Sequence, residues 1–284
     1  MSLRALLEAP GVLQAPGVYD GLSALLVAQA GFPVMFLSGA GLAYTRFGRP
    51  DLGLVSMSEL TETVAVIRER VELPMIVDGD TGFGNALNLQ RTVQRLEQAG
   101  ASAIQFEDQL APKRCGHMRG KQVVSADEMV GRVRAALDAR RSEDTLIIAR
   151  TDALALEGLD SALERAEAYL EAGADLLFIE GPRSVEEMER TASRFAARVP
   201  LVHNLVEGGG SPLRDAAALD RLGFRVALYP SMLVHLFARQ APEFLARLAA
   251  EGSTDGFADA LLDLQEINGV LGADTLLARA ARYA

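Results

Sequence analysis

Residues 98–107 read Gln-Ala-Gly-Ala-Ser-Ala-Ile-Gln-Phe-Glu, and residues 171–180 read Glu-Ala-Gly-Ala-Asp-Leu-Leu-Phe-Ile-Glu. Each segment closes a helix-length stretch with a glycine, the residue that most readily ends a helix. A short, mainly apolar run follows and ends at a glutamate. Because such runs do not alternate apolar with polar residues, they are typical of strands buried on both faces of a parallel sheet. The recurrence of helix, glycine and strand indicates a repeated β/α unit.

Runs of this kind occur eight times along the chain. Seven are clear, at residues 34–38, 74–78, 103–107, 146–150, 176–180, 201–205 and 225–229, and a weaker one lies near 17–20. Helix-length segments separate them, and one opens at Ser125 with a cap-like serine and early acids. Eight strands with intervening helices in about 250 residues is the size of a (β/α)8 TIM barrel. A doubly wound open sheet is the alternative, but the sequence lacks the GxGxxG loop that usually follows its first strand.

The composition favours one large domain. The chain has 284 residues, of which 49% are hydrophobic, so it can bury a sizeable core. No low-complexity linker or break in composition divides it, and we therefore predict a single barrel domain over residues 1–284. Residues 233–248 and 257–281 have the pattern of further helices, which predicts a helical extension from about residue 231 to residue 284.

Charge and cysteine content narrow the partners and the compartment. The net charge is −10, from 28 basic and 38 acidic side chains, which disfavours binding to the phosphates of nucleic acid or of an anionic membrane. The one cysteine excludes an internal disulfide and suits a reducing cytoplasm. No signal peptide is recognisable, and no apolar run approaches the ~18 residues of a membrane span. We therefore predict a cytoplasmic protein.

Acidic residues gather where two of the predicted strands end, which is where β/α barrels carry their catalytic groups. Asp78 and Asp80 are separated by one residue, so on a strand both side chains point to the same side. Converging carboxylates repel unless a cation or a shared proton neutralises them. Together with Glu107 they offer hard oxygen ligands, which predicts Mg²⁺ or Mn²⁺ held largely through water. The alternative is that these acids cap the next helix or bind amides of the glycine-rich turn.

Two further strand ends are suited to binding an anion. Arg150 ends an apolar strand, where a guanidinium must be paired and can bind a carboxylate through two hydrogen bonds. An internal ion pair of Arg150 with Glu180 or Asp152 is an equally good interpretation. The segment Ser38-Gly39-Ala40-Gly41 allows close backbone approach and offers N–H donors.

Cys115 lies in the segment Lys113-Arg114-Cys115-Gly116-His117. Nearby positive charge favours the thiolate over the thiol, which is typical of a reactive cysteine. The alternative is a solvated basic loop that contains a thiol without a chemical role.

These motifs together resemble the isocitrate lyase and phosphoenolpyruvate mutase superfamily, and within it most of all the 2-methylisocitrate and 2-alkylmalate lyases. The matching segments include residues 37–39, 77–84, 106–109, 113–117 and 149–153, and the similarity runs from about residue 10 to about residue 250. The resemblance implies a barrel that swaps its last helix with a partner subunit, in a homotetramer or dimer. It also implies Mg²⁺ near Asp78, Asp80 and Glu107.

The chemistry implied by the resemblance is the cleavage of a 2-hydroxy di- or tricarboxylate into a 2-oxo acid, such as pyruvate, and a carboxylic acid. Cys115 is then the general acid that protonates the enediolate left by carbon–carbon cleavage. Lys113, Arg114 and His117 supply positive potential, and Glu180 is one candidate for receiving the hydroxyl proton through water. The residues implied in substrate binding are Ser38, Gly39, Ala40, Arg150, Asn204 and His235.

Several positions depart from the pattern of these relatives. Phe36 replaces a common tyrosine, Val206 and Gly208 stand where hydroxyl side chains occur, and His235 stands where methylisocitrate lyases carry arginine. These differences predict a substrate with fewer carboxylates, so a 2-alkylmalate fits better than isocitrate. Two alternatives stay open: a carboxyphosphonoenolpyruvate or phosphoenolpyruvate mutase or oxaloacetate hydrolase in the same barrel, and a non-catalytic barrel that binds dicarboxylates.

Overall fold

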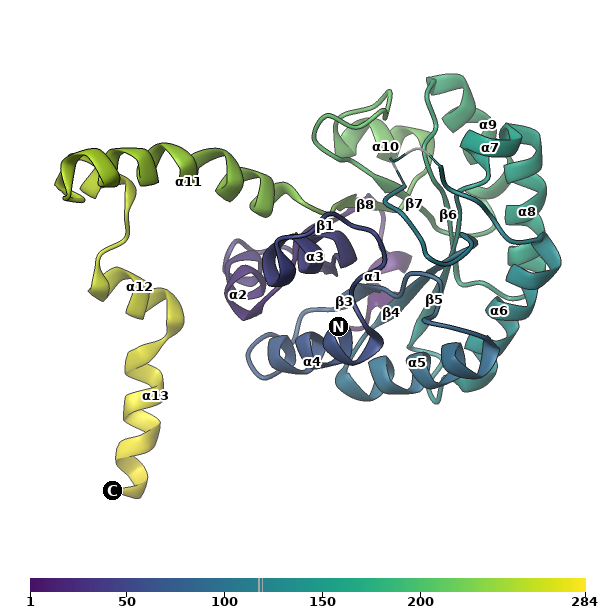
Figure 1. Cartoon of the computed structure of the whole chain (residues 1–284). Coiled ribbons are helices and arrows are strands. Elements are labelled where there is room, and N and C mark those ends of the chain that lie inside the picture. The colour runs from purple at the N-terminus through teal and green to yellow at the C-terminus, as the bar shows by residue number, and fades with distance from the viewer. Residues whose placement is uncertain (117, 119) are drawn as a thin grey trace. The chain divides into compact units, whose positions relative to one another are not determined.

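The computed structural model describes residues 1–116, 118 and 120–284 (Figure 1). Within these residues the chain forms two compact units, residues 1–232 and residues 233–284, and each is described separately. No helix among the described residues combines the length and the apolar character needed to cross a membrane.

The first unit is a closed barrel of parallel strands that pair in chain order (Figure 1). The strands are β1 (Leu13–Val18), β2 (Met35–Leu37), β3 (Met75–Asp78), β4 (Ala103–Glu107), β5 (Leu146–Thr151), β6 (Leu176–Ile179), β7 (Leu201–Asn204) and β8 (Val226–Tyr229). The barrel closes where β1 pairs with β8, with Leu13 opposite Val226 and Pro16 opposite Tyr229. The predicted (β/α)8 fold is therefore confirmed.

One helix precedes the first strand, and the helices that follow the strands surround the barrel (Figure 1). They are α1 (Leu3–Glu8), α2 (Gly21–Gln29), α3 (Gly39–Phe47), α4 (Met57–Arg68), α5 (Ala86–Ala99), α6 (Ala126–Ala139), α7 (Leu154–Glu157), α8 (Leu159–Glu171), α9 (Val185–Phe195) and α10 (Ala216–Leu222). Local sequence sets their ends: Ser125 caps α6 by accepting a hydrogen bond from Glu128 N, and α5 ends at Gly100, whose φ of 107° lies in the left-handed region.

The core fills the inside of the barrel with inward-facing side chains from successive strands. It includes Phe36, Ile76, Ile148, Phe178 and Val202, each 3% exposed or less. Leu3 of α1 is fully buried in the same cluster, so the N-terminal helix contributes to the barrel core. Because side chains alternate along a strand, the residue two positions beyond each core residue also faces inward.

One boundary prediction was wrong. The first strand covers residues 13–18 rather than 17–20. Pro16, which has no N–H to donate, obscured the strand, and Asp20 instead caps α2 by accepting from Ser23 N at 2.7 Å. Residues 257–281 contain several short helices. The segments there are η1 (Asp255–Ala260), α12 (Leu264–Leu271) and α13 (Ala273–Ala280), and Gly272, with φ 72°, separates the last two.

The second unit begins with α11 (Met232–Glu251), continues through η1, α12 and α13, and ends with η2 (Ala281–Tyr283). Its own contacts are few. The ring of Phe257 meets the ring of Phe244 edge to face at 4.9 Å, and the Arg247 guanidinium lies 4.9 Å from the centre of the Phe257 ring. These contacts join α11 to the turn that follows it.

Candidate active site

A ring of polar side chains stands directly above the barrel core. Five of the residues predicted for the site follow a core residue by two positions, within the strand or directly after its end: Ser38 after Phe36, Asp78 after Ile76, Arg150 after Ile148, Glu180 after Phe178, and Asn204 after Val202. Glu107 ends β4 in the same way and is buried. The strand periodicity thus brings these six predicted residues together at the carboxyl ends of the strands.

Asp78 and Asp80 converge, but not for the reason that the sequence suggested. The strand β3 ends at Asp78, and Asp80 has a left-handed φ of 48°. The convergence therefore comes from this turn, not from the alternation of side chains along a strand. A Cβ atom at Gly39 would lie 3.2 Å from Asp78 Oδ2 and 3.5 Å from Asp80 Oδ1. A side chain at position 39 would therefore be in tight contact with Asp78 Oδ2, and glycine avoids this contact.

Lys113 neutralises this acidic cluster from the loop that follows β4. Its Nζ atom lies 2.7 Å from Asp80 Oδ1 and 2.6 Å from Asp51 Oδ1, and all three side chains are buried. Burial alone lowers the pKa of Lys113, but the surrounding carboxylates, Asp80 foremost, outweigh it and hold that pKa well above its ordinary value. Lys113 therefore carries its charge as an integral part of the cluster.

Asp51 is a site residue that the sequence reasoning missed. It lies in the loop after α3, and its carbonyl oxygen accepts a hydrogen bond from Cys115 N at 3.2 Å. Asp51 thus holds the loop of Cys115 through the backbone as well as through Lys113. The signal in the sequence is weak, because an acid after Pro50 in a loop belongs to no strand end.

The carboxylates of the cluster suit a divalent cation with oxygen ligands. Burial, above all, raises the pKa of Asp80 to about 7 and holds that of Glu107 well above its ordinary value. Glu107 Oε1 is buried and accepts no hydrogen bond from a described residue. The described residues contain no three ligating side chains already gathered around one point. A cation such as Mg²⁺, which keeps much of its water, fits these oxygen donors.

Arg150 is buried among carboxylates at the centre of the ring. Its Nε and Nη2 atoms donate to Asp152 at 2.9 and 3.1 Å, and its Nη2 atom lies 3.5 Å from Glu180 Oε2. The internal ion pair is therefore present. Nη1 forms no hydrogen bond with a described residue, so it can still bind a ligand's carboxylate. The pKa of Asp152 is about 2, because Arg150 and Lys121 outweigh the effect of burial.

Asp108 holds the backbone of Asp152, the partner of Arg150, in place. Its carboxylate accepts hydrogen bonds from Thr151 Oγ1 at 2.7 Å, Tyr169 Oη at 2.8 Å and Asp152 N at 2.9 Å. Asp152 in turn also accepts from Lys121 Nζ at 2.7 Å. The residues that orient Arg150 are thus themselves fixed.

The loop with the predicted reactive thiol lies over the ring. Gly116 packs so closely that a methyl group there would overlap with Arg150 Nη2 and would lie 2.9 Å from Glu180 Cγ. The Gln109 side chain bonds both Arg114 N and Arg114 O, at 3.0 and 2.9 Å. Cys115 is half-buried. His117, also predicted as a site residue, lies outside the described residues.

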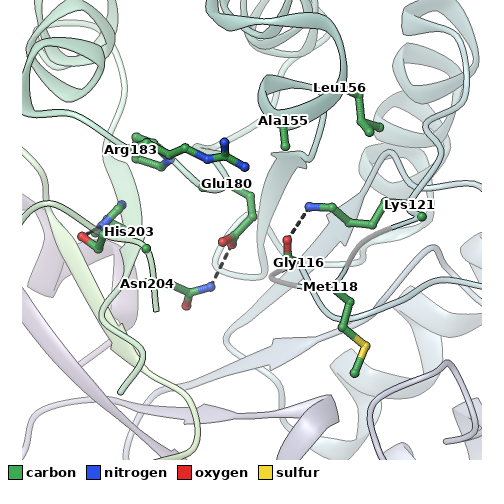
Figure 2. Close-up of a pocket in the computed structure, with 14 residues that line it drawn as sticks. Gly116, Met118, Lys121, Ala155, Leu156, Glu180, Arg183, His203 and Asn204 are labelled. Carbon is green, nitrogen blue, oxygen red and sulfur yellow. Dashed lines mark hydrogen bonds between the residues drawn. The ribbon is translucent and has the colours of Figure 1, made fainter. Parts of the chain in front are cut away.

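A pocket of about 380 Å³ opens beside this loop (Figure 2). Glu180 and Asn204 line it and are joined by a hydrogen bond of 2.9 Å from Asn204 Nδ2 to Glu180 Oε2. The other described lining residues come from the loop after β4, from α7, from the loop after β6, and from β7 and the loop after it. His235 lies in the second unit, so its predicted role in substrate binding stays a prediction.

Comparison with known proteins places this arrangement among related enzymes. The family model described as phosphoenolpyruvate phosphomutase matches residues 3–249. The 2,3-dimethylmalate lyase of Eubacterium barkeri is 39% identical over 274 residues, which cover 96% of this chain and 94% of that protein. The 2-methylisocitrate lyase of Aeropyrum pernix is 41% identical over 270 residues, covering 95% of this chain and 86% of that protein.

Solved structures agree with these relatives. Oxaloacetate acetylhydrolase in complex with 3,3-difluorooxalacetate superposes with a TM-score of 0.93 at 33% identity, covering 100% of this chain and 96% of that one. Phosphonopyruvate hydrolase in complex with oxalate and Mg²⁺ superposes with a TM-score of 0.89 at 32% identity, covering 99% and 97%.

Proposed function

The chain belongs to the phosphoenolpyruvate mutase and isocitrate lyase superfamily, and from this membership we propose that it is a magnesium-dependent carbon–carbon lyase. Its substrate is a 2-hydroxy di- or tricarboxylate of the 2-alkylmalate or 2-methylisocitrate type. Its products are a 2-oxo acid such as pyruvate and a carboxylic acid. The names of the relatives, which include lyases, a mutase and hydrolases, support the enzyme class more strongly than the substrate.

The observation that carries the proposal is the position of the loop of Cys115. Gly116, the residue after Cys115, packs against Arg150 and Glu180. The N–H group of Cys115 donates to the carbonyl oxygen of Asp51, next to the acidic cluster. The thiol of Cys115 therefore belongs to a loop that contacts the polar ring at both points. A lyase needs such a proton donor for the enediolate, whereas the migration of a phosphoryl group does not.

The ring holds the end of the substrate that becomes the 2-oxo acid. Arg150 binds its carboxylate through Nη1, and the amide of Ala40 lies at the N-terminus of α3, which favours an anion. The Gly39 N–H group donates to Asp78 Oδ2 at 3.4 Å and so links this helix end to the acidic cluster. Asp78, Asp80 and Glu107 would hold Mg²⁺, which when bound supplies Lewis-acid stabilisation of the oxygen that becomes the carbonyl.

The remaining residues move protons and exclude water. Glu180, oriented by Asn204 and Arg150, accepts the proton of the 2-hydroxyl group through a water molecule. The carbon–carbon bond then breaks, and its electrons form an enediolate on the departing acid. Cys115 donates its proton to that carbon, while Lys113, Arg114 and His117 supply positive potential. Closure of this loop during the reaction would keep bulk water from the enediolate.

Steady-state assays of the purified protein test this function. With Mg²⁺ we expect turnover of 2,3-dimethylmalate or 2-methylisocitrate and little of isocitrate, and EDTA should abolish it. Turnover of oxaloacetate or phosphonopyruvate alone would replace the lyase by a hydrolase, the alternative favoured by the similarity to oxaloacetate acetylhydrolase. If no compound reacts and Mg²⁺ with a dicarboxylate does not raise the melting temperature, the protein is a scaffold.

We also propose that the protein is a homotetramer or a dimer in which the C-terminal unit packs on a partner subunit. Large apolar side chains of this unit are exposed, including Phe237 at 69%, Leu264 at 78% and Leu277 at 67%. Several large exposed apolar side chains within one unit are typical of an interface between subunits. Sedimentation equilibrium measures the oligomer, and a monomer at micromolar concentration would contradict the proposal.

A further inference from the structure

Among the described residues that line the pocket beside Glu180, one charged side chain forms no ion pair inside the protein. Lys121, Glu180 and Arg183 are the charged residues among the described residues that line it. Lys121 pairs with Asp152 at 2.7 Å, and Glu180 lies against Arg150 and Asn204. The Arg183 guanidinium forms no ion pair with any described residue. The pocket as a whole therefore favours an anion at the position of Arg183.

The backbone of Arg183 is fixed, although its side chain is exposed. The N–H group of Arg183 donates to Glu187 Oε2 at 2.6 Å, and the next residue, Ser184, caps α9. Figure 2 shows the guanidinium reaching inward over the pocket from this anchored position. An arginine held in this way loses little backbone freedom when it binds a carboxylate, and its planar fork can form two parallel hydrogen bonds.

On the opposite wall, the side chains of His203 and Ser211 are hydrogen-bonded to each other. Ser211 Oγ donates its hydrogen to Leu213 O at 2.8 Å, so in the 2.8 Å contact between Ser211 Oγ and His203 Nε2 the histidine is the donor. The Ser211 hydroxyl hydrogen is therefore already engaged within the protein. Among the described lining residues, Arg183 is left as the charged donor without an ion pair that can select a ligand.

The pocket has room for more than a short leaving acid. Its volume of about 380 Å³ is within the usual range of small-molecule pockets and has room for on the order of ten water-sized groups. Ala155, Leu156 and Pro182 supply apolar wall, and Arg183 stands at its edge. This combination suits a short carbon arm that ends in a carboxylate.

We propose that Arg183 is a specificity-determining residue that binds a carboxylate at the end of the arm of the departing acid. This inference rests on the proposed lyase function and selects, within it, substrates that carry a third carboxylate. Phe36, Val206 and His235 predicted a substrate with fewer carboxylates, because relatives carry hydroxyl groups or arginine at those positions. The proposal for Arg183 predicts the opposite. Arg183 supplies a cation from a different element, the loop before α9.

Two matched pairs of compounds test the proposal. The substrates are 2-methylisocitrate and its analogue with an ethyl group in place of the carboxymethyl arm, and the corresponding products are succinate and butyrate. For the wild-type protein we expect kcat/KM to be higher for 2-methylisocitrate. In Arg183→Met this preference should fall roughly 10- to 100-fold, mainly through KM, as expected for the loss of a charge-assisted hydrogen bond. Arg183→Lys should restore part of it.

Calorimetric titration with succinate and butyrate, in the presence of Mg²⁺ and pyruvate, separates this inference from the lyase function. We expect the wild-type protein to bind succinate at least about 10-fold more tightly than butyrate, and Arg183→Met to bind the two alike. The matched control is Arg134→Met on the exposed face of α6, which should change neither preference.

The outcomes are distinguishable. Equal affinity of the wild-type protein for succinate and butyrate, or an unchanged preference in Arg183→Met, overturns the role of Arg183 even if the enzyme cleaves its substrates. A preference for succinate that depends on Arg183, without cleavage of any 2-hydroxy acid, supports Arg183 and overturns the lyase function instead.

Discussion

The two sides of the active site differ in how much of their charge is already neutralised. On the side of β3 and β4, Lys113 bridges Asp51 and Asp80, and Glu107 lies 3.4 Å from Arg150, with all of these side chains buried. On the side of β6 and β7, a pocket is open and Arg183 on its rim has no ion pair with a described residue. On the first side the charged groups are paired with one another without a ligand. On the second side the charge of Arg183 is available to pair with a ligand.

This difference indicates that the first side stabilises the transition state and the second side selects the substrate. Groups that must stabilise a transition state gain from being fixed in advance, since no reorganisation is then needed during the reaction. Groups that select among substrates gain from a charge that only the right substrate neutralises. The loop of residues 113–116 joins the two sides, because Lys113 belongs to the acidic cluster while Gly116 lines the pocket.

The largest effect is expected from replacing the thiol in the connecting loop. In Cys115→Ser, kcat should fall by about 100- to 10,000-fold, the usual contribution of a general acid, because a hydroxyl donates its proton far less readily than a thiol. KM should change little, since neither the fixed side nor the pocket loses a binding group. The measurement is steady-state turnover with saturating Mg²⁺. Near-full activity of Cys115→Ser would exclude the proposed lyase chemistry and favour the mutase alternative.

A second test separates the loop from the two sides that it joins. In Gly116→Ala the new methyl group would overlap with Arg150 Nη2. The Arg150 guanidinium is held in place, because its Nε and Nη2 atoms both donate to Asp152 and it lies over the Phe178 ring. We expect kcat/KM to fall roughly 10- to 100-fold, as a displacement of about 1 Å in an active site does.

Gly131→Ala is the control for that variant. A Cβ atom at Gly131 meets nothing within 4 Å, and the residue lies inside α6. Activity should be unchanged and the free energy of unfolding should rise by about 0.5–1 kcal/mol, because alanine favours a helix over glycine. Equal activity of the two variants would show that the loop does not close onto Arg150 during turnover.

A third test weakens the support of the fixed side without touching its reacting groups. Tyr169→Phe removes the hydroxyl that donates to Asp108 at 2.8 Å and leaves the buried ring in place. We expect a loss of about 1–2 kcal/mol in the free energy of unfolding, measured in urea, because Asp108 stays buried with one donor fewer. Tyr283→Phe, at a position 86% exposed, should leave stability unaltered. Equal stability of both variants would mean that Asp108 needs no donor from Tyr169.

The same contrast explains what could be predicted from the sequence. The polar ring follows from strand periodicity, since Asp78, Arg150 and Glu180 lie two residues beyond a core residue on strands that are recognisable as apolar runs. No comparable periodicity predicts which residues of a loop face the site. Asp51 and Arg183 are brought to the site by the tertiary arrangement of loops after α3 and β6, and their sequence neighbourhoods resemble many surface turns.

Even on the strands, geometry beyond the strand end escaped prediction. Asp80 reaches the cluster through a left-handed turn with φ 48°, a conformation that a non-glycine residue rarely adopts and that sequence alone did not reveal. The interruption of the C-terminal helices at Gly272 is the same kind of case, because a glycine within a helical pattern can either continue the helix or end it.

The smallest effect concerns how pH and Mg²⁺ act on the fixed side. Burial raises the pKa of Asp80 to about 7, with Asp78 and Asp51 adding to the rise and Lys113 opposing it. In the unfolded chain the pKa of an aspartate is about 3.9, so between about pH 4 and pH 7 the native state binds more protons than the unfolded state. The contribution of Asp80 to stability therefore falls as the pH rises through this window in the metal-free protein.

Mg²⁺ should reverse this trend, because a divalent cation binds the deprotonated carboxylate and competes with the proton. We expect the rise in melting temperature on adding Mg²⁺ to be a few degrees larger at pH 8 than at pH 6, measured by differential scanning calorimetry. In Asp80→Asn the difference between the two pH values should shrink, since the titrating carboxylate is gone. An equal effect of Mg²⁺ at both pH values in the wild-type protein would mean that the cation does not bind at Asp80, and the contrast between a fixed metal side and an open selective side would lose its chemical basis.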